Sequence, residues 1–138
     1  MKGPSGCVPE GPFPCHPSLV KYVVLIYGNP SSRAAWDGMS DEQRAAGLAY
    51  YRQLNDDLDA SGERIVSERL AFPEATKQVS VGDTGPMTTD GPFAEAKEFL
   101  AGFYLLDCAS FERAVEIAGR IPEASFGVVE VRPVMGLS

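Results

Sequence analysis

Two short segments of this chain, residues 21–27 and 99–106, are apolar on both of the faces that an extended strand presents. In the first segment, Tyr22, Val24 and Ile26 alternate with apolar residues that point to the opposite side. Strands of this composition are normally buried on both faces. The chain must therefore build a sheet whose central strands are covered on both sides.

Local signals predict two helices. Ser40 is a suitable N-cap for the first, because acidic residues follow it, apolar residues then recur at helical spacing, and Gly62 ends the pattern. Ser110 begins the second helix, and Pro122 ends it. The residues around Trp36, which follow Gly-Asn-Pro at the end of the first strand, are predicted to form a loop.

Three further segments, 64–70, 76–81 and 126–134, have the composition of strands. Segment 76–81 alternates apolar with polar residues, which predicts a half-exposed strand near a sheet edge. The sequence Gly-Asp-Thr-Gly at 82–85 predicts a hairpin turn. The resulting βαββαβ order predicts an α+β, ferredoxin-like fold, with an antiparallel sheet and two helices on one face.

The other face of this sheet would expose a large apolar surface unless something covered it. A second copy of the chain provides the same apolar face, and twofold dimers are the commonest soluble assemblies. The sequence therefore predicts a homodimer in which two sheets face each other as a dimeric α+β barrel. The alternative is that residues 1–19 fold over the face, although they offer few apolar side chains.

Length and charge limit the class of protein. A chain of 138 residues, 44% hydrophobic, is sufficient for one domain. The formal charge of −7 argues against direct binding of nucleic acid, and no apolar run in the domain approaches the roughly 20 residues that span a membrane. Three cysteines without a repeated spacing favour a reducing, cytoplasmic location.

Residues 1–19 differ in composition from the rest, with five prolines and three glycines, and we call them the leader. A start codon assigned upstream of the domain would explain the leader, and the domain is expected to comprise residues 20–138. Cys7, Cys15 and His16 match no usual zinc spacing, so we expect no metal site there. Cys108 ends an apolar segment and is predicted to be a buried thiol.

Three stretches together resemble the DGPF, or YCII-related, family: residues 21–28, residues 89–98 with 102–104, and residues 129–134. The resemblance implies a bacterial protein that forms a dimeric α+β barrel, with a functional link to extracytoplasmic-function sigma factors and without a proven reaction. Related proteins carry a His–Asp pair that suggests an enzyme. Asp90 corresponds to the Asp, whereas the single His of this chain, His16, lies in the leader.

Asp90 begins the Asp-Gly-Pro-Phe segment and has two interpretations. In the first, it forms a turn, because an Asp carboxylate can accept a backbone N–H two residues further on. In the second, it is a catalytic acid or base in a cleft near the dimer interface. Both interpretations stay open at the level of sequence.

The other candidate residues are charged or aromatic. Glu95, Lys97 and Glu98 precede a buried strand and form either a polar site or a solvated surface. Glu130 and Arg132 lie two residues apart, so they share one strand face and can form an ion pair or bind a common ligand. Three aromatic residues that offer a stacking surface complete the candidate ligand-binding set, although such residues more often belong to the core: Tyr27, Trp36 and Tyr104.

Two classes of function follow. One is a small enzyme in which Asp90 performs acid–base chemistry on an organic substrate, with Lys97 or Arg132 holding an anionic group. The other is a small-molecule-binding or accessory protein. The absence of a histidine from the domain favours the second class, and no nucleotide-binding glycine motif is present, so we expect no cofactor.

Overall fold

The computed structural model describes residues 21–92, 97–125 and 127–136. The leader, with Cys7, Cys15 and His16, and the residues Phe93 and Glu95 of the predicted site region lie outside the described residues. In chain order the elements are β1 (Lys21–Gly28), α1 (Pro30–Asp37), α2 (Asp41–Ser61), β2 (Arg64–Arg69), η2 (Pro73–Ala75), β3 (Lys77–Gly82), β4 (Gly85–Asp90), β5 (Phe99–Asp107), α3 (Phe111–Gly119), η3 (Pro122–Ser125) and β6 (Val128–Pro133).

The main sheet has four strands in the order β2-β5-β1-β6, and each neighbouring pair is antiparallel. The two segments that are apolar on both faces, β1 and β5, form its centre, as the sequence predicts. The register places Val24 opposite Tyr104 on one side and opposite Val131 on the other. This strand order confirms the α+β prediction, whereas the dimeric barrel stays a prediction.

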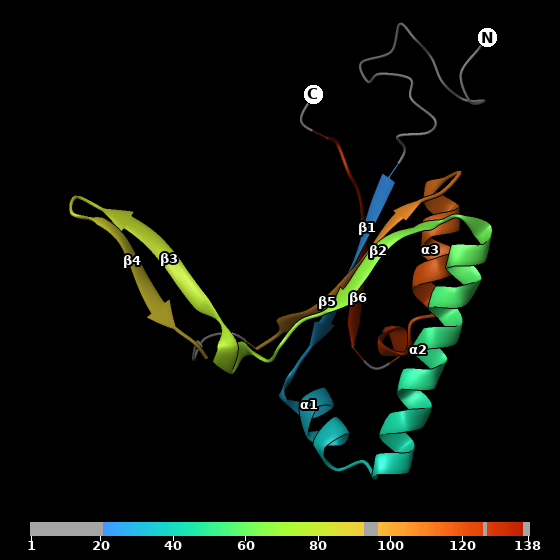
Figure 1. Ribbon diagram of the computed structural model, residues 1–138, viewed down its shortest axis with the longest axis horizontal. Coiled ribbons are helices and arrows are strands. Elements are labelled where there is room, and N and C mark those ends of the chain that lie inside the picture. The colour runs from blue at the N-terminus through green and yellow to red at the C-terminus, as the bar shows by residue number, and fades with distance from the viewer. Residues whose placement is uncertain (1–20, 93–96, 126, 137–138) are drawn as a thin grey trace, which may run out of the picture.

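Helices α2 and α3 cover one face of the sheet (Figure 1). Val24 and Leu106 of the central strands are fully buried there, against Leu54 of α2 and Ile117 of α3. Ser40 caps α2 through a reciprocal pair of hydrogen bonds with Gln43, and Gly62 ends the helix with a left-handed φ of 78°. Among the described residues, no helix has both the length and the apolar character needed to cross a membrane.

The region of Trp36, which we predicted to be a loop, is helix α1. The Asn29 side chain accepts a hydrogen bond from the backbone N–H of Ser32, and the Ser32 hydroxyl accepts one from the N–H of Asn29. Pro30 occupies the first helical position, where its lack of an N–H costs nothing. The Gly-Asn-Pro signal therefore ends β1 and begins a helix at the same point.

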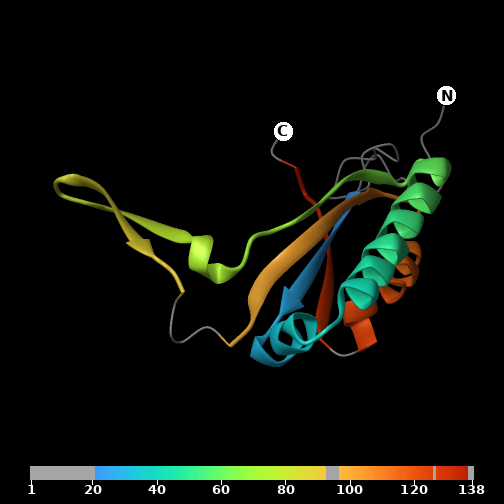
Figure 2. The same cartoon turned by 60° about the horizontal axis from the view of Figure 1, so that its bottom comes forward.

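The second correction concerns segment 76–81, which we expected near an edge of the main sheet. It forms β3, which pairs only with β4, in a separate two-stranded hairpin. We call residues 77–90 the arm. The arm projects from the sheet on the side opposite α2 and α3 (Figures 1 and 2). Nearly every residue in it is exposed, so it is not a half-buried part of the core.

Candidate functional site

The side of the main sheet opposite α2 and α3 is called here the open face. Its centre is apolar, because Val23 lies opposite Leu105 and Leu25 lies opposite Phe103. These four side chains are half-buried, whereas their neighbours along each strand are fully buried against the helices. The apolar second face that the sequence predicts is therefore present.

Four of the predicted ligand-binding residues lie on or beside the open face, in a row that runs from the Tyr27 end of β1 to the position opposite Val23. On β6, Glu130 lies opposite Leu25 and Arg132 lies opposite Val23, so both side chains share the open face with Tyr27 of β1. Glu98 immediately precedes β5, whose first residue pairs with the last residue of β1, next to Tyr27. We call Tyr27, Glu98, Glu130 and Arg132 the open-face cluster.

The pKa of Tyr27 depends on the other three side chains of the cluster. Burial raises the pKa of the Tyr27 hydroxyl, the carboxylate of Glu130 raises it further, and Glu98 adds to this effect. The positive charge of Arg132 acts in the opposite direction. A tyrosine hydroxyl with its ordinary pKa of about 10 is already protonated at neutral pH, and the raised pKa leaves it so, which makes Tyr27 available as a hydrogen-bond donor. The cluster thus combines a hydroxyl donor, a guanidinium and two carboxylates.

Asp90 does not belong to this cluster. It is the last residue of β4, directly opposite Lys77, and its carboxylate forms an ion pair of 2.6 Å with the Lys77 ammonium. The expected hydrogen bond from two residues further on is wrong, because that residue is Pro92, which has no N–H. Instead, the Gly91 N–H donates to the Thr76 carbonyl at 2.7 Å. Asp90 therefore closes the base of the arm, and 72% of its side chain is exposed.

The remaining predicted site residues are Tyr104, Trp36 and Lys97. Tyr104 points to the helix side of the sheet, where it is buried and its hydroxyl donates to the Asn55 side chain. Trp36 lies on α1, and the guanidinium groups of Arg44 and Arg69 both lie over its ring, each 5.7 Å from the ring centroid. Lys97 is exposed. Tyr104 is a core residue, and none of the contacts between described residues connects Trp36 to the open-face cluster.

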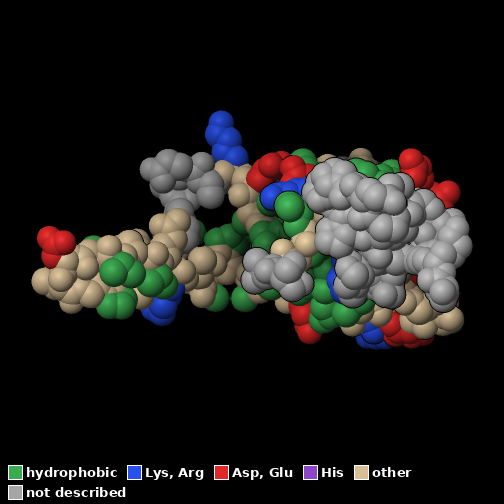
Figure 3. All heavy atoms as spheres, turned by 90° about the horizontal axis from the view of Figure 1, so that it is seen from above, with side chains coloured by type: hydrophobic (Ala, Val, Ile, Leu, Met, Phe, Trp, Pro, Cys, Tyr) green, Lys and Arg blue, Asp and Glu red, His purple; other side chains and the backbone are tan. Residues whose placement is uncertain are grey.

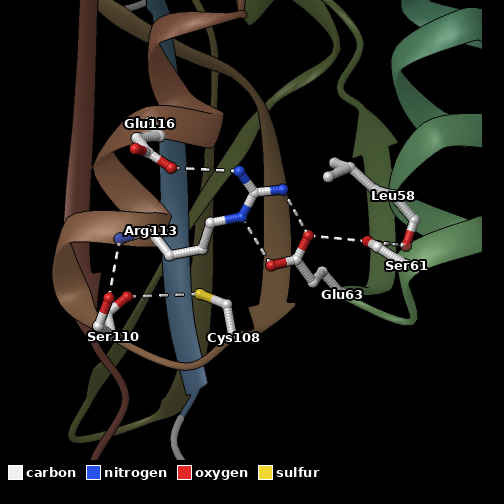
Figure 4. Close-up of polar contacts among 7 residues, drawn as sticks. All are labelled: Leu58, Ser61, Glu63, Cys108, Ser110, Arg113 and Glu116. Atoms are coloured by element: carbon white, nitrogen blue, oxygen red, sulfur yellow. Dashed lines mark hydrogen bonds and ion pairs between the residues drawn. The ribbon is translucent and has the colours of Figure 1, made fainter.

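A second polar network joins the start of α3 to the start of β2 (Figure 4). Arg113 donates two hydrogen bonds of 2.8 Å to the two carboxylate oxygens of Glu63 and one of 3.2 Å to Glu116. The Ser61 hydroxyl also donates to Glu63. All these groups are satisfied by one another, so this network is a structural tie and leaves little capacity for a ligand.

Cys108 lies beside this network and is buried, as the sequence predicts (Figure 4). Its thiol is 3.7 Å from the Ser110 carbonyl, and burial raises its pKa. A thiol with a raised pKa is a poor nucleophile at neutral pH. Within the part of the chain that the structure describes, no three His, Cys, Asp or Glu side chains are grouped so that they could hold a metal ion.

Comparison with known proteins gives the family. A family model described as the YCII-related domain matches residues 20–138. The chain belongs to the YCII-related family. An uncharacterized protein of Rhizobium meliloti (strain 1021) is 39% identical over 116 residues, which cover 81% of this chain and 90% of the relative. Since that relative is uncharacterized, the likeness assigns neither a reaction nor a ligand to this YCII-related chain.

Sequence reasoning missed Lys77, the partner of Asp90 in this YCII-related chain. The two residues are far apart in the sequence, and no short motif connects them. The signal lay in the hairpin turn: Gly82 pairs with Gly85, and Lys77 and Asp90 are equally distant from that pair. Extending the predicted hairpin in register from its turn would have placed the ammonium opposite the carboxylate.

Proposed function

We propose that this chain is a homodimeric, small-molecule-binding protein whose ligand site is the open-face cluster. The observation that carries the proposal is the row of polar side chains, Tyr27, Glu98, Glu130 and Arg132, along one side of an otherwise apolar face. A sheet face that served only as a dimer contact would gain nothing from two carboxylates and a guanidinium, because burying charges without partners is costly.

The chemistry of the cluster defines the ligand class. The guanidinium of Arg132 suits a carboxylate or phosphate group, which it can bind with two parallel hydrogen bonds. Tyr27, kept protonated, supplies another donor to the same group. Glu98 and Glu130 accept hydrogen bonds from hydroxyl or amino groups. The matching ligand is a small polar molecule with an anionic group at one end and donors at the other.

A second copy on the open face would shield such a ligand from water. Val23, Leu25 and Phe103 are half-buried in a single chain, and a facing sheet would complete their burial. Hydrogen bonds and ion pairs in the cluster would then act at a lower effective dielectric constant, which strengthens them. Binding at the dimer interface therefore combines the predicted homodimer with the observed cluster.

The acid–base function predicted for Asp90 has less support. Its carboxylate is exposed, is paired with Lys77, and lies on the arm rather than with the open-face cluster. The functional link to an extracytoplasmic-function sigma factor and the cytoplasmic location stay predictions from the sequence. We therefore place ligand binding ahead of catalysis.

The test compares ligand retention by variants of the full-length protein. Wild-type protein is mixed with a low-molecular-mass extract of bacterial cells, and the compounds retained after ultrafiltration are identified by mass spectrometry. We expect Arg132→Met and Tyr27→Phe to lose a retained compound at unchanged melting temperature, and Asp90→Asn to keep it. If Asp90→Asn alone loses the compound, the site lies at the Asp-Gly-Pro segment, and the proposed cluster is wrong.

A further inference from the structure

The arm, residues 77–90, is the most exposed regular structure among the described residues. Val79 and Val81 of β3 are 67% and 77% exposed. The register places Val81 opposite Pro86 and Val79 opposite Thr88, so these side chains share one face of the hairpin, which we call the valine face. Figure 3 shows hydrophobic side chains on the arm and in the recess between the arm and the body.

An arm of this kind lacks the packing that normally stabilises a hairpin. Its two strands have six residues each, and an isolated two-stranded hairpin is at best marginally stable in water. The ion pair between Lys77 and Asp90 and the hydrogen bond from Gly91 to Thr76 hold only its base. Exposed valines without a packing partner on the valine face therefore indicate a surface that is covered in the working protein.

The position of the arm indicates what covers it. The arm leaves the sheet on the side of the open face, opposite α2 and α3 (Figures 1 and 2). Any molecule that covers the open face therefore lies beside the arm. The open face and the valine face of the arm are both apolar and belong to the same chain. In a twofold dimer, each copy can therefore cover these two surfaces of the other copy.

We propose that the arm of each copy clasps a second copy and packs its valine face against the partner's sheet. This inference rests on the homodimer of the proposed function and adds an interface that does not involve the open-face cluster. The outward side chains of four short strands are fewer than the roughly 20–30 residues per side of a stable interface. The arm supplies the missing contact area.

The register of the arm also explains why its contact is apolar. Lys77 and Asp90 share the valine face but neutralise each other at its base. Beyond them, the valine face carries no charge until Asp83 in the turn. A protein surface is therefore a suitable partner for this face, and the second copy is the one whose own uncovered surface lies within reach.

Photo-cross-linking tests the contact directly. Val81 is replaced by the photoreactive residue p-benzoylphenylalanine in full-length protein, and copies labelled with ¹⁴N and ¹⁵N are mixed in urea and refolded together before irradiation, so that mixed dimers form. We expect cross-linked peptides of mixed isotope composition, which can form only between chains. Cross-links confined to one isotope composition, or none, would overturn the clasp even if the protein is a dimer.

Substitutions on the two faces of β3 provide the matched control. Val79→Lys with Val81→Lys is expected to raise the dimer Kd by about 10-fold or more in sedimentation, because it places ammonium groups in an apolar contact. Gln78→Lys with Ser80→Lys adds the same charge to the opposite face and should leave Kd nearly unchanged. A wild-type monomer would contradict the homodimer, and the clasp with it. A dimer that is indifferent to the valine-face pair would contradict the clasp alone.

Discussion

At the scale of single residues, close backbone approach constrains the chain more tightly than side-chain chemistry does. Gly102 of β5 lies where β5 pairs with β2, and a Cβ atom added there would be 2.8 Å from the Glu68 carbonyl oxygen. The obstacle is backbone, which cannot rotate away as a side chain can. A glycine is therefore required at this position by the pairing of two strands.

This requirement predicts that Gly102→Ala destabilises the protein by roughly 1–3 kcal/mol, the usual cost of overpacking. Gly47→Ala is the control, because Gly47 lies within α2 and an added Cβ would meet no atom within 4 Å. There, alanine should stabilise the helix by about 0.5–1 kcal/mol. Thermal or urea unfolding measures both changes. Equal melting temperatures for the two variants would show that β2 and β5 separate easily at Gly102.

At the scale of elements, the sequence predicted the type of each segment more reliably than its place in the fold. Local periodicity and caps located all four strands of the main sheet and helices α2 and α3. Helix α1 was missed because its capping signal coincides with the strand stop at Asn29 and Pro30. The arm was misplaced because alternation reports which residues share a face but not which sheet a strand joins.

For the candidate site, the sequence likewise predicted which residues share a strand face, but not where each face lies in the fold. Residues two apart on one strand, such as Glu130 and Arg132, necessarily share a face, so their proximity was predictable. The side of the sheet on which Tyr104 lies was not predictable, because β5 is apolar on both faces. Only tertiary packing places Tyr104 on the helix side. The pairing of Asp90 with Lys77 could be predicted only by extending the arm in register from its turn, because the residues next to Asp90 in the sequence give no sign of it.

The tie between α3 and β2 predicts a pH dependence of stability. The hydrogen bonds from Arg113 are the main reason that the pKa of Glu63 lies below its ordinary value, and burial partly opposes them. A folded-state pKa below the unfolded one stabilises the fold at pH values above the unfolded value, about 4.3 for Glu, and that stability is lost as the pH falls through the folded-state pKa.

We therefore expect Glu63→Gln to destabilise the protein at pH 7 by about 1–3 kcal/mol and to flatten the acid limb of its stability curve. Only 14% of the Glu63 side chain is exposed, whereas 40% of the Arg113 side chain is, so solvent screens this pair in part and the effect belongs in the lower half of that range. Glu116→Gln removes the other, exposed partner of Arg113 and should change stability little. Urea unfolding between pH 3 and 7 provides the measurement, and parallel curves for wild type and Glu63→Gln would contradict the tie.

At the scale of the whole molecule, the two faces of the main sheet differ in how far a single chain buries them. The helix face completes its core within one chain, since Val24, Leu106 and Ile117 are already fully buried. The open face and the arm leave apolar side chains half or wholly exposed. This asymmetry is the physical basis for the expected homodimer, because only the second set of surfaces gains burial from association.

The asymmetry leads to opposite outcomes for two neighbouring residues of β1. Leu25 lies at the centre of the open face, flanked by Phe103 and Glu130, so an aspartate there can reach water in a single chain but not between two facing sheets. Leu25→Asp should therefore give a folded monomer, seen by light scattering together with a cooperative thermal transition. Val24→Asp places the same charge in the fully buried core and should prevent folding. If Leu25→Asp still sediments as a dimer with wild-type affinity, the interface lies elsewhere, and the ligand site must be complete within one chain.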